Sequence, residues 1–353
     1  MLYAGISWHQ DYYQLAVIGP DGQRVIAPGG YYASHNVHRL VARLRELELT
    51  EPVTIAVEST NGTLDGRLMA AGLRVHRADP GLLPERPAFG AVQAEDIARA
   101  CLRYEREIVP LQRHRGTQTG REGELAGWIA GAADADRAQA ASGRLFHRGA
   151  GDRREVALTF DDGPLPPYTE MVLDILARYE LRATFFCCGI HVRGNAAELV
   201  RMREEGHAIG NHTWSHPFLP ELTRAQVAEQ VIRTGDAIAE AAGTGRPTLF
   251  RPPYAGRTPQ VLEQLAGLGV TTILGDVAPD DWAPREPDAV ARDVLAGVRP
   301  GSVVLLNDGG GERSATLAAL PRIIEGLLDD GYAFARVDDM ALRAEQARLV
   351  HTV

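Results

Sequence analysis

The chain has 353 residues, of which 45% are hydrophobic, and a formal net charge of −9 at pH 7. Its length is enough for two domains with buried cores, and its acidic balance argues against a general affinity for nucleic acids. No stretch approaches the ~20 apolar residues of a membrane-spanning helix, and the N-terminus lacks the features of a signal peptide. We therefore expect a cytoplasmic protein without membrane contact. The three cysteines, Cys101, Cys187 and Cys188, suit reduced thiols better than a disulfide framework.

Residues 1–110 have the pattern of a small α/β domain. Short apolar runs bounded by turn-forming residues predict strands over 3–7, 14–18, 53–57 and 73–76. Apolar residues at helical spacing predict helices over 36–47, near 62–71 and over 91–107. A hairpin, a helix, a strand, a helix and a strand are thus expected to follow one another along this part of the chain.

This order of elements resembles a ribonuclease H-like fold. The segments Tyr3–Trp8 and Ala56–Ser59 resemble the N-terminal domain of IS110-type transposases. That family has an acidic residue where Ser7 stands, a glutamate matching Glu58, and a later acidic pair whose second member falls at Ala98. Because phosphoryl transfer at two metal ions needs several carboxylates, the two lost acids predict that this chemistry is absent.

The charge of residues 1–110 also argues against DNA binding. This segment holds 11 arginines and 13 acidic residues, a net charge of −2. Proteins that bind the phosphate backbone concentrate basic residues instead. We therefore expect an inert accessory or docking domain, with a DNA-related role as the alternative.

Residues 111–152 are expected to connect this domain to the next one. The segment 113–120 is polar and rich in turn-forming residues, and 149–152 has the composition of a flexible step. Between them, an alanine-rich stretch over 122–141 predicts a helix. The second domain is then expected over 153–342, with a tail at 343–353.

From Glu155 onward, seven apolar runs alternate with stretches of helical spacing. The runs are Val156–Phe160, Ala183–Cys187, Ala208–Gly210, Thr248–Arg251, Thr271–Leu274, Ser302–Leu306 and Ala333–Val337. Alternating strands and helices predict a parallel sheet with helices outside, and seven repeats predict a distorted (β/α)7 barrel. Polar residues follow the C-terminal ends of several of these runs, where α/β barrels carry their active sites.

Two carboxylates and two histidines suggest a metal site on that face. Asp161 and Asp162 end the first run, and adjacent residues at the end of a strand point to opposite sides, so they can have different roles. His212 and His216 share a face if their segment is helical. One of the two aspartates and both histidines would hold one cation with a position left open, and the other aspartate would act as a general base. A helix cap is the alternative role for the aspartate pair.

Five motifs in order resemble the NodB-homology, or polysaccharide deacetylase, family over residues 154–340. They are Thr159–Gly163, His212–His216, Arg251–Tyr254, Asp281–Trp282 and Leu305–Asp308. The resemblance implies a distorted (β/α) barrel and a divalent metal, usually zinc and sometimes cobalt or nickel. It also implies hydrolysis of the N-acetyl or O-acetyl group of a sugar or glycan.

The resemblance also suggests roles for single residues. Asp162, His212 and His216 would hold the metal. The metal would polarise the acetyl carbonyl and lower the pKa of bound water, and Asp161 would take the proton from that water. Arg251 would pair with Asp161 and keep it ionised. The backbone N–H of Tyr254 would help to stabilise the tetrahedral oxyanion, because the preceding prolines have no N–H and fix the course of the loop. Trp282, Asp281 and Pro253 are expected around the acetyl pocket, and Asp276 and Asp281 are expected to support the catalytic network.

Asn307 departs from the family pattern, in which a histidine at this position protonates the leaving amine. Asparagine donates a hydrogen bond but cannot supply a titrating proton, and general acid catalysis is typically worth ~10²–10⁴-fold. The hypotheses are therefore a deacetylase of reduced activity and a carbohydrate-binding pseudoenzyme.

Ala255 also replaces a glycine that is common at this position in the family, which matters only if its φ is positive. Five further residues are expected to be structural: His191, His207, Trp214, Cys187 and Cys188.

Overall fold

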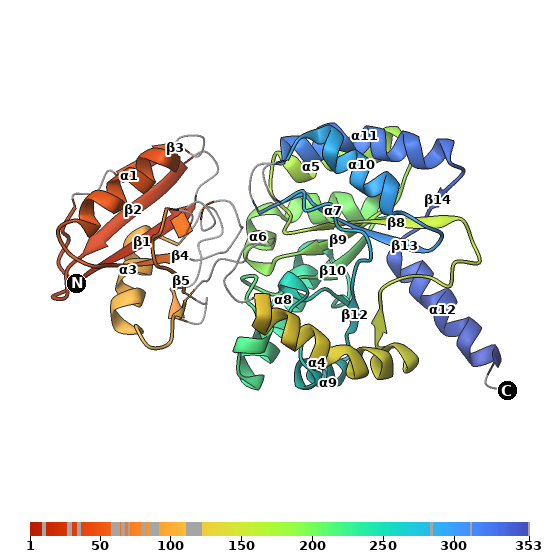
Figure 1. Ribbon diagram of the computed structural model, residues 1–353, viewed down its shortest axis with the longest axis horizontal. Helices are drawn as coiled ribbons and strands as arrows, with labels where there is room; N and C mark the ends of the chain where they lie inside the picture. Colours follow the sequence, from red (N-terminus) through yellow and green to blue (C-terminus); the bar gives the residue numbers. More distant parts are fainter. Residues whose placement is uncertain are drawn as a thin grey trace. The chain divides into compact units, whose positions relative to one another are not determined.

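The computed structural model describes residues 1–8, 12–26, 30–33, 37–57, 64, 68–69, 71–78, 82–84, 92–110, 122–282, 285–310 and 313–351. The chain forms two compact units, Met1–Glu122 and Gly123–Val353, called unit 1 and unit 2 below (Figure 1). Glu58 and most of the helix predicted near 62–71 lie outside the described residues.

Unit 1 contains a six-stranded sheet in the order β3-β2-β1-β4-β5-β6. The strands are β1 (Leu2–Trp8), β2 (Tyr12–Ile18), β3 (Gly30–Ala33), β4 (Val53–Val57), β5 (Val75–Arg77) and β6 (Val109–Pro110). The first three pair antiparallel, β4 and β5 continue parallel to β1, and β6 is antiparallel to β5. The strands predicted over 3–7, 14–18, 53–57 and 73–76 and the helices predicted over 36–47 and 91–107 are present in that order among the described residues, and β3 and β6 are additional strands.

Two helices cover the two faces of this sheet, because successive strand residues point to opposite sides. Leu2, Ala4 and Ile6 of β1 pack in one cluster with Leu40 and Leu44 of α1 (Val37–Glu48). Tyr3 packs in the other cluster with residues of α3 (Ala94–Arg103). Between them, a side chain at Gly5 would lie 2.0 Å from the carbonyl oxygen of Ala94, so only glycine permits this close helix–strand contact.

Ser7 and Ala98, which stand where the transposase family has acids, are buried in unit 1. The Ser7 hydroxyl is shielded from solvent and donates to Gln14 Oε1 over 3.3 Å. Ala98 is fully buried in the cluster under α3. Neither position offers a carboxylate for a cation.

Unit 2 contains an eight-stranded sheet in the order β13-β8-β9-β10-β11-β12-β7, with β14 also paired to β8. The strands are β7 (Leu145–Phe146), β8 (Glu155–Asp161), β9 (Thr184–Cys187), β10 (Ala208–Asn211), β11 (Leu249–Phe250), β12 (Thr271–Ile273), β13 (Ser302–Asn307) and β14 (Ala333–Phe334). All of these pairs are parallel. The sheet is curled, since Val277, beyond β12, bridges to Val304 of β13 at the far edge.

Helices surround this sheet (Figure 1). They are α4 (Glu122–Ala141), α5 (Tyr168–Arg178), α6 (Gly189–Val192), α7 (Ala196–Glu204), α8 (Arg224–Ala242), α9 (Pro259–Gly267), α10 (Pro287–Gly297), α11 (Ser314–Asp329) and α12 (Val337–His351). Local sequence fixes several ends. Thr223 and Gln226 form a capping box at the start of α8, and Gly243 ends this helix in a left-handed conformation.

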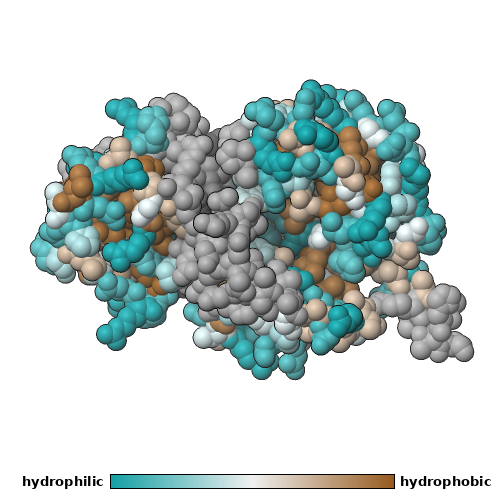
Figure 2. Space-filling model, in the orientation of Figure 1, coloured by the Kyte–Doolittle hydropathy of each residue, from teal (hydrophilic) through white to brown (hydrophobic). Residues whose placement is uncertain are grey.

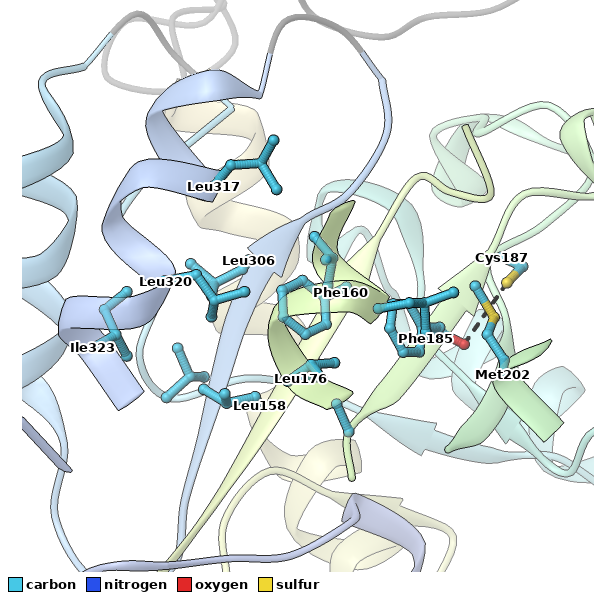
Figure 3. Close-up of a cluster of buried hydrophobic side chains, with 14 of the residues drawn as sticks. Leu158, Phe160, Leu176, Phe185, Cys187, Met202, Leu306, Leu317, Leu320 and Ile323 are labelled. Carbon is cyan, nitrogen blue, oxygen red and sulfur yellow. Dashed lines mark hydrogen bonds between the residues drawn. The ribbon is translucent and has the colours of Figure 1, made fainter. Parts of the chain in front are cut away.

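The alternation of strand residues separates an outer core from an inner one. Figure 3 shows Leu158 and Phe160 of β8 beside Leu306 of β13, packed under the apolar face of α11. Ala157, which precedes Leu158, belongs instead to the inner cluster, which Val337 of α12 helps to close. On the visible surface, hydrophilic side chains predominate around smaller hydrophobic areas (Figure 2).

Three boundaries differ from those predicted. The seventh run, Ala333–Val337, forms strand only at Ala333–Phe334, because α12 begins at Val337 and extends through most of the expected tail. The expected connection, 111–152, contributes α4 and β7 to unit 2.

In the part of the chain that the structure describes, we find no helix with the length and apolar character needed to cross a membrane.

Candidate metal centre

The parallel strands bring the predicted site residues to one edge of the sheet of unit 2. Asp161 and Asn307 are the last residues of β8 and β13, and they are register partners. His212 follows β10 and Arg251 follows β11 directly. Because the C-terminal ends of parallel strands meet at the same edge, residues separated by about 150 positions become neighbours.

Asp162, His212 and His216 offer one ligand atom each, and these atoms lie within 4.8 Å of one another. Asp162 Oδ1 is 3.5 Å from Nε2 of His212 and 3.2 Å from Nε2 of His216. The opposite nitrogen of His212, Nδ1, is 2.7 Å from the carbonyl oxygen of Arg251, to which it can donate. This bond directs the lone pair of Nε2 toward the carboxylate.

These residues fit a divalent cation. Asp162 Oδ1 is buried and has no hydrogen-bond partner among the described residues, although it faces two imidazole nitrogens. Burial lowers the pKa of His212, which favours the neutral imidazole that binds metals. One carboxylate and two imidazoles form the donor set of three-ligand catalytic zinc sites.

The local backbone differs from two expectations: a helical segment at 212–216, and adjacent aspartates that point to opposite sides. The segment 212–216 is not helical, since Thr213 and His216 have φ values of 70° and 57°. Side chains hold it, because Asn211 Oδ1 accepts from the Thr213 N–H and Thr213 Oγ1 accepts from the His216 N–H. Asp162 lies beyond β8 with a φ of 75°, so both aspartates approach His212 instead of facing opposite sides.

Asp161 forms the predicted ion pair with Arg251. Nη1 of Arg251 donates to Asp161 Oδ1 and to Thr159 Oγ1, each over 2.7 Å. The guanidinium lies over the ring of Phe186, at 4.2 Å from its centroid. Burial raises the pKa of Asp161, and the positive charge of Arg251 opposes this rise. The pair leaves Asp161 Oδ2 on the side of His212, at 3.8 Å from Nε2.

Asn307 contacts the candidate ligand set directly. Its Nδ2 donates to Asp162 Oδ2 over 3.1 Å, which leaves Oδ1 of the aspartate for the histidines. The backbone N–H of Asn307 donates to Asp281 Oδ2, which also accepts from the Thr316 hydroxyl. Asp281 is therefore buried behind Asn307, in keeping with the supporting role expected of it, and burial raises its pKa to about 6. Its place around an acetyl pocket stays a prediction.

Asp276 does not support the same network. Its carboxylate accepts from the Ser302 hydroxyl and the Val303 N–H, at the start of β13. Asn307 ends this strand, about 17 Å further along. The chain beyond β12 lies beside β13, so only its later part, at Asp281, comes near the site.

The segment after Arg251 places Tyr254 against a candidate ligand. The Tyr254 ring meets His216 edge-on, with centroids 4.6 Å apart, and the residue is 42% exposed. Tyr254 and Ala255 have φ values of 57° and 52°, so the position where glycine is common does require a left-handed backbone. Pro253 is buried and Trp282 is half-buried; their roles around an acetyl group stay predictions.

Several supporting residues lie outside the predicted motifs. Gln230 of α8 accepts at Oε1 from the N–H groups of Trp214 and Ser215, and thereby fixes the loop between the histidines. Thr169 of α5 donates to Asp308, a buried acid whose pKa is raised to about 7 by burial. A polar residue within an apolar helix face, as at Gln230, is the sequence signal that could have identified them.

The residues predicted to be structural are buried. His207 Nδ1 accepts from the Ala183 N–H, and His191 and Trp214 are also shielded. Cys101, Cys187 and Cys188 are free and buried, as expected. Gly309 and Gly310 pack against the candidate ligand Asp162, since a side chain at Gly310 would lie 2.5 Å from Asp162 Oδ2.

Comparison with known proteins places the similarity in unit 2. Residues 148–273 match the family model for polysaccharide deacetylase. The chain is 38% identical over 187 residues to a chitooligosaccharide deacetylase of Sinorhizobium fredii, covering 50% of this chain and 87% of that protein. It is 37% identical over 187 residues to the peptidoglycan-N-acetylglucosamine deacetylase PgdA of Listeria monocytogenes, covering 53% of this chain. It spans 39% of the length of the Listeria protein.

Solved structures of a deacetylase and of a CE4 family pseudoenzyme are also similar to this chain. The Bc1960 peptidoglycan N-acetylglucosamine deacetylase, in complex with 4-naphthalen-1-yl-N-oxidanyl-benzamide, matches with a TM-score of 0.56 and 31% identity. That match covers 57% of this chain and 95% of the solved chain. A mutant of BA3943, described as a CE4 family pseudoenzyme with restored enzymatic activity, matches with a TM-score of 0.52 and 27% identity. It covers 56% of this chain and 71% of the solved chain.

Proposed function

The chain belongs to the polysaccharide deacetylase family, and from this premise we propose that unit 2 is a metal-dependent carbohydrate deacetylase with a distorted (β/α)7 barrel. The observation that carries the proposal is the cluster of Asp162, His212 and His216 beside the Asp161–Arg251 ion pair. Its substrate would be an acetylated sugar or glycan, as the names of its relatives suggest.

The ligands would be Asp162 Oδ1 and Nε2 of both histidines, with zinc as the proposed ion and cobalt or nickel as alternatives. When bound, the cation supplies Lewis acidity, which polarises the acetyl carbonyl and makes water more acidic. Asp161 takes the proton of the attacking water at Oδ2, while Arg251 holds Oδ1. The Tyr254 backbone N–H is proposed to donate to the oxyanion.

Asn307 supports a second candidate function, a carbohydrate-binding pseudoenzyme. Its amide keeps the candidate ligand Asp162 in place but cannot protonate a leaving amine. The similarity to BA3943, a pseudoenzyme by description, shows that the family includes such proteins. For unit 1 we propose the ribonuclease H-like assignment, supported by its strand order, and an accessory role without DNA chemistry.

Metal analysis and acetate release test the two functions together. We expect one divalent ion per chain and acetate release from at least one member of a panel of N- and O-acetylated sugars. His216→Ala should lose both properties, whereas Asp161→Asn should keep the metal and lose acetate release. A chain that binds metal and glycan but releases no acetate would be the pseudoenzyme, and a chain without bound metal would refute both.

A further inference from the structure

The loop that carries Tyr254 is attached to a helix outside the segment that matches the family model. Arg257, only 8% exposed, donates through Nε to Asp136 Oδ1 and Oδ2, over 2.9 and 3.1 Å. Its Nη2 donates to Asp136 Oδ2 over 2.8 Å. Asp136 belongs to α4, which precedes the matching residues 148–273. The planar guanidinium therefore joins α4 to the loop in a two-pronged ion pair.

The third nitrogen of the same guanidinium holds the loop itself. Nη1 of Arg257 donates to the carbonyl oxygen of Ala255 over 2.8 Å. Tyr254 and Ala255 are consecutive non-glycine residues in the left-handed region. Such conformations persist only where the surroundings hold them, and Arg257 supplies a hydrogen bond at this point.

The position of this loop matters to the metal centre. The Tyr254 ring packs edge-on against His216, a candidate ligand, with centroids 4.6 Å apart. A chain of direct contacts thus leads from Asp136 through Arg257 and the Ala255 carbonyl to Tyr254 and His216.

We propose that Asp136 is a positioning residue for the metal centre, acting through Arg257 to hold the Tyr254–Ala255 turn against His216. The proposal rests on the proposed function for its catalytic consequence, but not for its effect on metal binding. The geometry requires a carboxylate that accepts from two nitrogens of one guanidinium while the remaining nitrogen stays on Ala255.

A purely structural role is the competing explanation, and α4 provides a control for it. Ala132 of α4 packs with Leu145 and Leu262 in an apolar cluster that does not include Arg257. Leu262 is 2% exposed and lies on α9. Leu262→Ala therefore weakens the attachment of α4 without changing the ion pair.

The experiment compares full-length wild type with Asp136→Asn, Arg257→Lys and Leu262→Ala. Asn keeps the shape of Asp136 but has a single acceptor oxygen, and Lys keeps the charge of Arg257 but not its fork. Thermal unfolding, zinc affinity by competition with a chelating dye, and kcat and KM for acetate release are measured for each. Zinc affinity requires no activity, so it decides the proposal even if no acetylated substrate is hydrolysed and the proposed function fails.

We expect Asp136→Asn and Arg257→Lys to weaken zinc binding by about tenfold and to lower kcat by about 10- to 100-fold. Leu262→Ala should lower the unfolding temperature at least as much, but change zinc affinity and kcat by no more than about twofold. Zinc affinity unchanged in Asp136→Asn would overturn the proposal. An equal loss of zinc affinity in Leu262→Ala would also overturn it, because the effect would then follow stability alone.

Discussion

Replacing Asn307 with histidine should separate two kinds of acetyl substrate. Hydrolysis of an N-acetyl group releases acetate and expels the sugar amine, whose nitrogen must gain a proton as the C–N bond breaks. Hydrolysis of an O-acetyl group expels a sugar oxygen, which tolerates negative charge better. A general acid typically contributes ~10²–10⁴-fold, equivalent to ~2.7–5.4 kcal/mol of transition-state stabilisation. We therefore expect Asn307→His to raise the N-acetyl rate by this range and the O-acetyl rate by less than about tenfold.

The substitution also has a cost that the structure defines. Asn307 Nδ2 donates to Asp162 Oδ2 over 3.1 Å, and a hydrogen bond to a charged group contributes ~1.5–3 kcal/mol. Loss of this bond should weaken metal binding by about 10- to 100-fold. The backbone bond from Asn307 to Asp281 is independent of the side chain and should survive. The gain in rate is thus expected only when the metal is saturating.

The assay measures acetate released from an N-acetylated chitooligosaccharide and from an O-acetylated xylooligosaccharide, at several zinc concentrations. Asn307→Ala is the matched control, because it loses the same bond to Asp162 without gaining an acid. If Asn307→His, folded and fully loaded with zinc, cleaves the N-acetyl substrate no faster than Asn307→Ala, a missing proton donor is not what limits this site.

Three further predictions follow from individual contacts. Burial raises the pKa of Asp308 from 3.8 to about 7, so the folded state holds this proton more tightly than the unfolded state does. The free energy of unfolding should therefore fall by up to ~4 kcal/mol as pH rises from about 4 to about 7. Urea unfolding of chelator-treated protein measures this dependence on pH, and Asp308→Asn should remove it. Removing the metal should lower the unfolding temperature, and zinc at about 1,000 times its Kd should restore ~4 kcal/mol of unfolding free energy. His216→Ala is the control and should show no such response to zinc. Ala255 has a φ of 52°, so Ala255→Gly should raise stability by up to about 1 kcal/mol in denaturant unfolding; a loss would show that this turn is not strained.

The sequence predicted the parts of this protein that depend on repeated pattern. Alternating apolar runs predicted the parallel sheet of unit 2, and the parallel arrangement placed Asp161 and Asn307 at one edge. Short strands carry too little pattern: β7 has two residues and was not predicted. The predicted seventh strand was too long for a related reason, because the three residues Ala335–Val337 are too few to distinguish the end of a strand from the start of a helix.

The candidate site was predicted by residue type but not by backbone geometry. A helical His212–His216 segment would bring the rings together, yet the observed loop does so with left-handed residues and side-chain hydrogen bonds. Such a conformation depends on tertiary partners, of which Gln230 is one. The different places of Asp276 and Asp281 likewise depend on where the chain beyond β12 meets β13, and local sequence does not specify this.

The left-handed residues also indicate how the site is maintained. Positive φ values occur at Asp162, His216, Tyr254 and Ala255, and residues other than glycine adopt such angles at a cost in conformational free energy. Around the histidines, hydrogen bonds within the loop oppose this cost. At Tyr254 and Ala255 the support comes from Arg257, whose partner Asp136 lies 121 positions away in sequence. The family motifs alone therefore do not account for the geometry of this centre, which also depends on a helix that precedes the family segment.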